Sequence, residues 1–222
     1  MNPQFWYAVC FFVLAILVIL LDHFYGMLRT PNTAVNKPYS YSKVQLAWWT
    51  VIIIAAFAAI LLVACDVPVF DQSTIILLGI SAATTTASKV IGLSDQSNPK
   101  VNPANLNLES DNFILDILSD ENGVTVHRLQ ALLFNFIFGI WFILKVWNNI
   151  ALLPSGKLDA SHIIPIMDPN NLLLIGISSG TYAAMRATEN KTPSPPTTPA
   201  PSTTSTSPSA TTTPTTTAPT GG

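Results

Sequence analysis

The sequence predicts an all-α integral membrane protein with five transmembrane helices, and three observations lead to this prediction. Only 10% of the 222 residues are charged and 49% are hydrophobic, whereas a soluble domain has about 25% charged residues. The apolar residues gather into stretches long enough to cross the ~30 Å hydrocarbon layer as helices. A block of two such stretches occurs twice, so we expect one N-terminal helix followed by two parallel two-helix repeats.

The five apolar stretches differ in strength. Three are uncharged throughout, namely Phe5–Leu21, Leu46–Cys65 and Leu129–Leu144. The other two, from about Val69 to Val90 and from about Asn171 to Ala187, are rich in small residues and are predicted partly from the repeat. No basic segment precedes the first stretch and no clean small-residue cleavage site follows it, so it is predicted to be a retained helix rather than a secretion signal.

The chain is expected to have five parts. These are an N-terminal transmembrane helix (1–25), a first repeat (26–90), an acidic cytoplasmic loop (91–126), a second repeat (127–188) and a Thr/Pro/Ser-rich tail (189–222). The tail cannot bury a core, so we expect it to be disordered. Within the loop, the apolar residues between Phe113 and Leu118 predict a short amphipathic helix at the membrane interface.

The distribution of Lys and Arg predicts the orientation. If the N-terminus is outside, two cations, Lys145 and Lys157, lie outside, and eight lie inside: Arg29, Lys37, Lys43, Lys89, Lys100, Arg128, Arg186 and Lys191. Cytoplasmic loops carry an excess of Lys and Arg. The N-terminus is therefore expected outside and the C-terminus in the cytoplasm.

The internal repeat is gapless over its second helix. The block Val67–Lys89 aligns with Ile164–Arg186 at an offset of 97 residues, and Pro, Asp, Gly, Ser and Thr positions are identical. The preceding helices align at an offset of 85, which brings Lys43-x-Gln45 onto Arg128-x-Gln130 and leaves an insertion around Asn149–His162. The two copies share one orientation, unlike the inverted repeats of many transporters.

A second set of motifs carries a resemblance. The set is Asp120-Glu121-Asn122-Gly123, His127-Arg128-x-Gln130, Met167-Asp168 and the run from Leu174 to Tyr182. Over about residues 40–190 the chain resembles uncharacterised bacterial multi-pass inner-membrane proteins with a duplicated Leu-x-Gly-Ile-Ser-x-x-Thr helix. The resemblance implies a bacterial inner-membrane setting, and it implies no activity.

Small residues recur every four positions on both repeated helices. They are Gly79, Ala83 and Ala87 on the first and Gly176, Gly180 and Ala184 on the second. In lipid, such residues let helix backbones approach closely. We therefore predict that these two helices are inner ones, packed on each other or on a neighbouring subunit, and that the other three spans face lipid more.

A stripe of hydroxyl groups runs beside the small residues. It comprises Ser81, Thr84, Thr85 and Ser88 on the first helix and Ser178 and Thr181 on the second. The hydroxyls either bond to helix carbonyls and neighbouring helices or line a hydrated path. Asp71 and Asp168, at the outer helix entrances, either cap the helices or form an acidic pore mouth. Gln45 and Gln130 are candidates for a buried hydrogen bond between the repeats.

No catalytic, cofactor-binding or metal-ligating set is recognisable. His23, His127 and His162 lie in three separate loops, and Cys10 and Cys65 lie in or at the end of apolar stretches. No nucleophile, phosphate-binding or zinc motif occurs, and no basic cluster suits nucleic acid. The chain is therefore expected to be no enzyme, to need no cofactor and to bind no nucleic acid.

Two functions remain open. The first is a non-enzymatic membrane scaffold or interaction module that self-associates, and the alternative is an oligomeric ion or small-solute channel lined by the Ser/Thr faces of the two repeated helices. A transporter built on the parallel repeat is a third, weaker reading. The expected partners are the lipid bilayer, further copies of the chain in a homo-oligomer, and a cytoplasmic protein that binds the 91–126 loop or the tail.

Overall fold

The computed structural model describes residues 2–30, 36–65, 67–68, 70–98, 101, 109–110, 112–120, 123–156 and 158–189. All of them belong to one compact unit, Met1–Thr192, and the predicted tail from residue 190 onwards lies outside the described residues. Of the described residues, 78% are helical. The predicted helical fold is therefore confirmed at this level.

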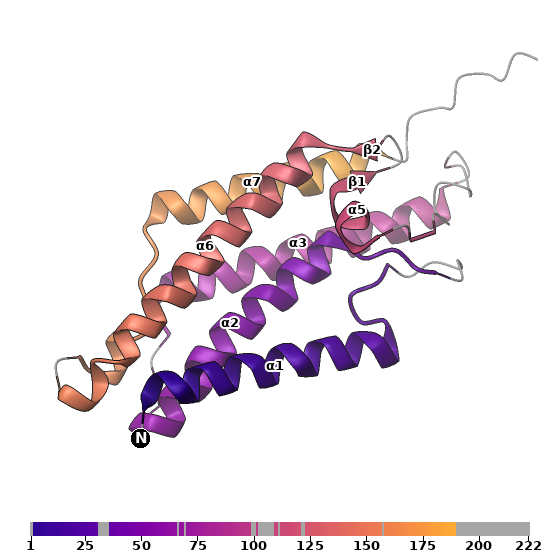
Figure 1. Cartoon of the computed structure of the whole chain (residues 1–222). Helices are drawn as coiled ribbons and strands as arrows, with labels where there is room; N and C mark the ends of the chain where they lie inside the picture. Colours follow the sequence, from indigo (N-terminus) through magenta and orange to yellow (C-terminus); the bar gives the residue numbers. More distant parts are fainter. Residues whose placement is uncertain are drawn as a thin grey trace, which may run out of the picture. The chain divides into compact units, whose positions relative to one another are not determined.

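The described part of the unit contains five long helices (Figure 1): α1 (Pro3–Tyr25), α2 (Tyr41–Ala64), α3 (Gln72–Ser97), α6 (Val126–Ile150) and α7 (Pro169–Glu189). Four of them, α1, α2, α3 and α6, are long and apolar enough to cross a membrane. The chain is thus of the integral membrane type, as its composition predicts. Among the described residues α7 is not one of these four, because its sequence is richer in polar and small residues.

The helix ends have local causes. Asn2 caps α1 by accepting a hydrogen bond from the Gln4 N–H at 3.1 Å, and Gly26 ends the helix in the left-handed region at φ 61°, where glycine is unstrained. The third helix runs to Ser97, past the predicted end near Val90. It stops at Asn98 because the following residue is Pro99, and a residue before proline avoids the helical region.

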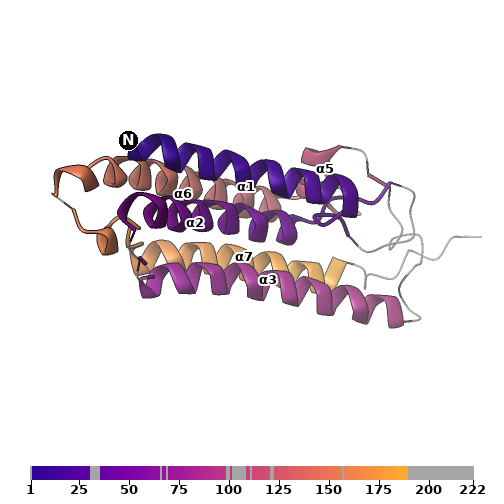
Figure 2. The same ribbon diagram turned by 90° about the horizontal axis from the view of Figure 1, so that it is seen from below.

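The helix α2 lies at the centre of the unit. It packs against α1, α3 and α6, while α7 packs against α3 and α6. Figure 2 shows α3 and α7 side by side in one layer, with α1, α2 and α6 in the other. In the most apolar stretch of α2, 44% of the residues are buried, against 6% in α1. We expected α1, α2 and α6 to face lipid more than α3 and α7, and this is wrong for α2 and for α6, whose apolar stretch is 28% buried against 22% in α3. The helix α1 is the most exposed of the four, in line with the expectation.

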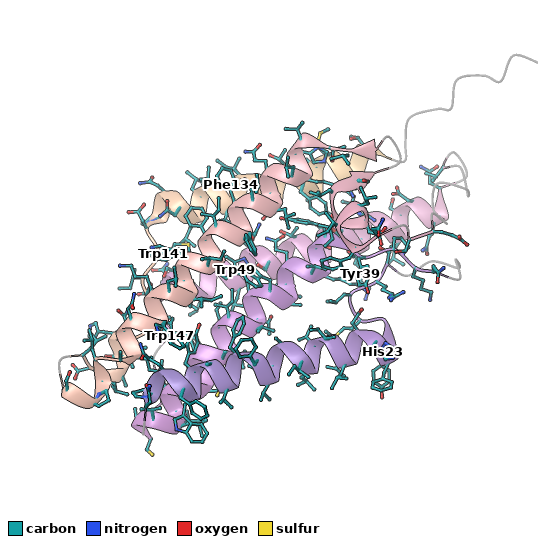
Figure 3. All side chains as sticks on the ribbon, in the orientation of Figure 1. His23, Tyr39, Trp49, Phe134, Trp141 and Trp147 are labelled. Atoms are coloured by element: carbon teal, nitrogen blue, oxygen red, sulfur yellow. The ribbon has the colours of Figure 1, made fainter. Side chains whose placement is uncertain are left out.

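The burial of α2 follows from its composition. Ala55, Ala56 and Ala59 are fully buried and let neighbouring helices come close, and Ile52, Ile53 and Ile60 fill the space around them. Trp49 points into the bundle from the same helix and is also fully buried (Figure 3). A sequence that is apolar on every side does not reveal which of its helices is central.

Short elements close the two ends. At the end where α2 and α6 begin, α5 (Phe113–Leu118) is followed by an antiparallel pair, β1 (Ser119–Asp120) and β2 (Gly123–Val124), with Ser119 opposite Val124. The predicted short helix in the loop therefore exists. At the other end, two 3-10 helices, η1 (Leu153–Ser155) and η2 (Ala160–His162), lie in the connection from α6 to α7.

Candidate functional site

A cluster of polar side chains is buried where α2, α6 and α7 meet, and Asn135 of α6 is its centre. The Asn135 Oδ1 accepts hydrogen bonds from Gln45 Nε2 at 3.1 Å and from Trp49 Nε1 at 2.8 Å. The Asn135 Nδ2 donates to the Tyr41 hydroxyl at 3.0 Å and to the Ala131 carbonyl at 2.8 Å. Both ends of this amide are therefore satisfied, as a buried amide requires.

Gln45 extends the cluster to α7. Its Nε2 donates to the Ser179 Oγ at 3.0 Å as well as to Asn135, and the Gln45 side chain is only 3% exposed. This confirms the prediction that Gln45 forms a buried hydrogen bond between the two halves of the chain. Gln130, its counterpart in the repeat, is exposed.

Tyr41, Gln45 and Trp49 occupy one face of α2, because they are spaced four residues apart. Sequence reasoning missed Asn135 as their common partner. The available signal was one amide in the middle of the uncharged stretch Leu129–Leu144. A strongly polar side chain at that depth needs partners on neighbouring helices.

A second group of contacts ties the β1–β2 hairpin to the helices. The rings of Tyr41 and Tyr182 lie with centroids 4.6 Å apart. The Arg128 guanidinium lies 5.6 Å from the centre of the Tyr182 ring, a cation–π arrangement. Arg128 Nη1 also donates to the Ser119 carbonyl. The start of α6, the hairpin and α7 are thereby linked around Tyr182.

The predicted hydroxyl stripe is mostly buried, and several of its groups bond within the protein. Ser81, Thr84, Ser88 and Ser178 are buried, whereas Thr181 is exposed. Ser81 and Thr84 donate to the carbonyls four residues earlier, at 3.2 and 2.8 Å. Thr85 donates to the Ser81 carbonyl and, across to α2, to the Ser42 carbonyl at 3.0 Å. The hydroxyl stripe of α3 thus contacts α2 through Thr85, whereas Thr181 of α7 is exposed and does not join it.

The predicted packing residues lie largely on the outer faces of α3 and α7. Gly79, Ala83, Gly180 and Ala184 are exposed, and Ala87 and Gly176 are partly buried. A Cβ placed on Gly79 or Gly180 would have no neighbour within 4 Å among the described residues, and one on Gly176 would lie 3.6 Å from Ile80 Cδ1. These residues therefore make little of the contact within the chain.

Gly139 of α6 is the glycine that packs closely inside the bundle. A Cβ at this position would lie 2.7 Å from Trp48 Cε2 and Cζ2, and it would also overlap Nε1. The Trp48 indole occupies the space beside Gly139 and donates from Nε1 to the Asn135 carbonyl at 3.2 Å. Sequence reasoning missed Gly139 because it stands alone, without another small residue four positions away.

Asp71 and Asp168 cap α3 and α7 in the same way. Asp71 accepts from the Ser73 N–H and Asp168 from the Asn170 N–H, both at 2.8 Å. The Ser73 backbone N–H, followed by the Ser73 hydroxyl, holds the pKa of Asp71 below its usual value. A negative charge also suits a helix N-terminus.

Replacing Asp71 with Ala is expected to lower the free energy of unfolding by roughly 1 kcal/mol, because the cap is lost, while Asn should preserve it. Because the pKa of Asp71 is lowered in the folded state, the carboxylate stabilises the fold above its unfolded pKa of about 3.9. This contribution is lost as the pH falls through the lower folded pKa. Thermal melts of the wild type, Asp71→Ala and Asp71→Asn between pH 3 and pH 7 measure it. A melt of Asp71→Ala equal to wild type at pH 7 would contradict the capping role.

The described residues contain no group of three His, Cys, Asp or Glu side chains placed to hold a metal ion. Comparisons with family models, curated proteins and solved structures gave no match to this chain. The helices define the class as a helical integral membrane protein.

Proposed function

We propose that the protein is a non-enzymatic membrane scaffold or interaction module that self-associates through the outer faces of α3 and α7. One observation carries the proposal: Gly79, Ala83, Gly180 and Ala184 lie exposed on two helices that pack side by side. Small residues facing lipid contribute little surface, whereas against another helix they allow close backbone approach. The bundle itself is held elsewhere, by the Asn135 cluster and Gly139, so these outer faces remain for a second copy.

In this proposal α7 is the fifth transmembrane helix. Its 21 residues would span about 32 Å at 1.5 Å per residue, enough for the hydrocarbon layer. The polar residues Ser178, Ser179 and Tyr182 are buried in the bundle, whereas Leu173 and Ile177 are 61% and 56% exposed. The exposed side of α7, which also carries Gly180 and Ala184, is thus more apolar than the helix as a whole.

Several contacts support two parallel repeats, α2–α3 and α6–α7. The helix pairs α2–α3 and α6–α7 each pack together, and α2 also packs on α6 and α3 on α7. Asp71 and Asp168 make equivalent caps. Thr85 and Tyr182 hold the same repeat position, and each contacts the start of the preceding helix, at Ser42 and Arg128 respectively.

The proposed orientation has the N-terminus outside and the C-terminus in the cytoplasm of a bacterial inner membrane. Arg29 follows α1, Lys43 and Arg128 lie in the first turns of α2 and α6, and Lys89 and Arg186 lie in the second half of α3 and the last turn of α7. These parts of the helices lie away from the N-terminus in Figure 1, which supports this orientation by the positive-inside rule. The inner-membrane assignment rests on the resemblance. A cytoplasmic protein partner would bind the 91–126 loop or the tail.

Replacing Gly180 with Leu is expected to abolish self-association and to leave the monomer folded. A Cβ at Gly180 has no described neighbour within 4 Å in its own chain, but a leucine side chain there would keep the helix of a second copy from approaching closely. Mass photometry in nanodiscs and a thermal melt measure the two effects. Gly92→Leu is the matched control, because a Cβ on Gly92 also has no described neighbour within 4 Å. Gly92 lies about 220° around α3 from Gly79, and therefore outside the proposed interface. A Gly180→Leu protein with wild-type stoichiometry would refute the proposed interface.

The alternative is an oligomeric channel. It is favoured by the Ser88 and Ser178 hydroxyls, which are buried and have no hydrogen-bond partner among the described residues. Against it, Ser81, Thr84 and Thr85 direct their hydroxyls to backbone carbonyls. Such bonds are the usual arrangement of Ser and Thr inside a helix and need no aqueous path.

Ion flux separates the two functions. For a scaffold, proteoliposomes with the wild type are expected to show no flux above empty liposomes, and the Thr84→Val/Thr181→Val variant should be equally silent and equally stable to within about 1 kcal/mol. Val keeps the shape of Thr and removes the hydroxyl. Flux through the wild type that this variant abolishes would establish the channel in place of the scaffold.

A further inference from the structure

A hollow lies at the end of the unit where α3 begins and α6 ends. It has a volume of about 570 Å³, and its walls come from the start of α3, from one side of α6 and from the 161–166 segment. Trp141, Lys145 and Asn149 face it from α6, since they are four residues apart on one side of that helix. Figure 3 labels Trp141 on α6. The Asn149 Nδ2 donates to the Ile163 carbonyl at 3.0 Å and holds the segment against α6.

Opposite charges line this hollow without pairing. Asp71 and Lys145 are both among its wall residues, and neither forms an ion pair with a described residue. His162 and Ser161 lie on the same wall segment, with the Ser161 Oγ 3.0 Å from the His162 Nδ1. The Asp71 carboxylate can accept further hydrogen bonds in addition to the one that caps α3. The hollow therefore offers a carboxylate that can bind a positively charged group and an ammonium that can bind a negatively charged group.

The aromatic and apolar residues at the hollow can accommodate a cationic group and an acyl chain. Phe70 and Trp141 are aromatic, and an ammonium group is attracted to such faces beside a carboxylate. Leu144, next to Lys145, is 56% exposed, and Ile166 of the wall is 66% exposed. Trp141 and Lys145 lie in the last three turns of α6, and Trp and Lys near the end of a membrane helix are typical of the level of the headgroups. A ligand here can hold its polar head in the hollow while its tail stays in the bilayer.

We propose that the hollow binds the headgroup of a zwitterionic phospholipid, with its phosphate at Lys145 and its ammonium at Asp71 between Phe70 and Trp141. Lys145 then binds any phospholipid phosphate, and Asp71 selects a headgroup with a positive charge. The proposal does not depend on self-association, because every wall residue belongs to one chain.

Native mass spectrometry of the full chain in detergent tests the proposal, with equal amounts of phosphatidylethanolamine and phosphatidylglycerol of matched acyl chains as probes. The wild type should retain the ethanolamine lipid preferentially. Asp71→Asn, which keeps the helix cap, should lower this preference about threefold. Lys145→Gln should lower the retention of both lipids. Matched controls are Asp168→Asn, a cap outside the hollow, and Lys89→Gln, an exposed lysine on α3.

Equal retention of the two lipids by the wild type would overturn the proposal, as would an equal effect of Asp71→Asn and Asp168→Asn. Displacement of the bound lipid by an equimolar amount of soluble phosphoethanolamine would also overturn it, because the ligand would then be a free zwitterion. A thermal melt of each variant identifies loss of folding. Effects confined to Asp71→Asn and Lys145→Gln, with wild-type melts, would support it.

Discussion

Replacing Asn135 with Leu is expected to lower the free energy of unfolding by about 2–3 kcal/mol. The change leaves Trp49 Nε1 and the Tyr41 hydroxyl without the partner that each has in the bundle. It also removes one of the two acceptors of Gln45 Nε2, which keeps its bond to Ser179. One such bond between membrane helices contributes on the order of 1 kcal/mol, and a buried donor left without a partner is costly. Unfolding in sodium dodecyl sulfate, followed by circular dichroism, measures the loss.

Thr50→Val is the matched control for Asn135→Leu. Thr50 holds the same repeat position on α2, but it is exposed and donates only within its own helix, to the Leu46 carbonyl at 2.7 Å. Its replacement should change the free energy of unfolding by less than about 0.5 kcal/mol. If Asn135→Leu unfolds at the same detergent fraction as Thr50→Val, the polar cluster does not hold α2, α6 and α7 together.

Replacing Gly139 with Ala is expected to lower the free energy of unfolding by about 1–3 kcal/mol, the usual effect of overfilling a packed interior. The added methyl group would overlap the Trp48 indole. Trp48 would have to turn away, and its hydrogen bond to the Asn135 carbonyl would be lost. The same detergent titration, with Trp fluorescence as a second readout, measures the effect.

Gly79→Ala serves as the control for Gly139→Ala, because a Cβ on Gly79 meets no described atom within 4 Å. Alanine also has the higher helix propensity, so this variant should be no less stable than the wild type as a monomer. Equal destabilisation by the two substitutions would mean that α2 and α6 do not approach at Gly139 as described.

The long helices could be predicted from the sequence because apolar length is visible along the chain. The predicted stretches Phe5–Leu21 and Leu129–Leu144 lie inside α1 and α6. The helices are longer than these stretches because they end at capping residues, such as Asn2 and Gly26 of α1, which lie beyond the apolar residues. The end of α3 was missed because its last two turns are polar but still helical. Such turns lie beyond the apolar stretch and carry no membrane signal.

The inside of the bundle was harder to predict. Apolar stretches such as Leu46–Cys65 look alike on every side, so the central place of α2 depends on contacts with distant parts of the chain. The hydrogen bond of Gln45 was predicted from the repeat, but its partners Asn135 and Ser179 occupy positions where the first repeat has Thr50 and Ala82. The two copies have diverged there, and only the structure brings these side chains together.

The central claim is that the outer faces of α3 and α7 meet a second copy of the chain. Cross-linking in native membranes tests it most directly, with single cysteines at Ala83, Ala184 or Ile137 in a background without Cys10 and Cys65. Ala83 and Ala184 are exposed on the proposed faces, and Ile137 is 57% exposed on α6. We predict cross-linked dimers from Ala83→Cys and Ala184→Cys but none from Ile137→Cys. Equal cross-linking at all three positions, or none at Ala83 and Ala184, would contradict the claim.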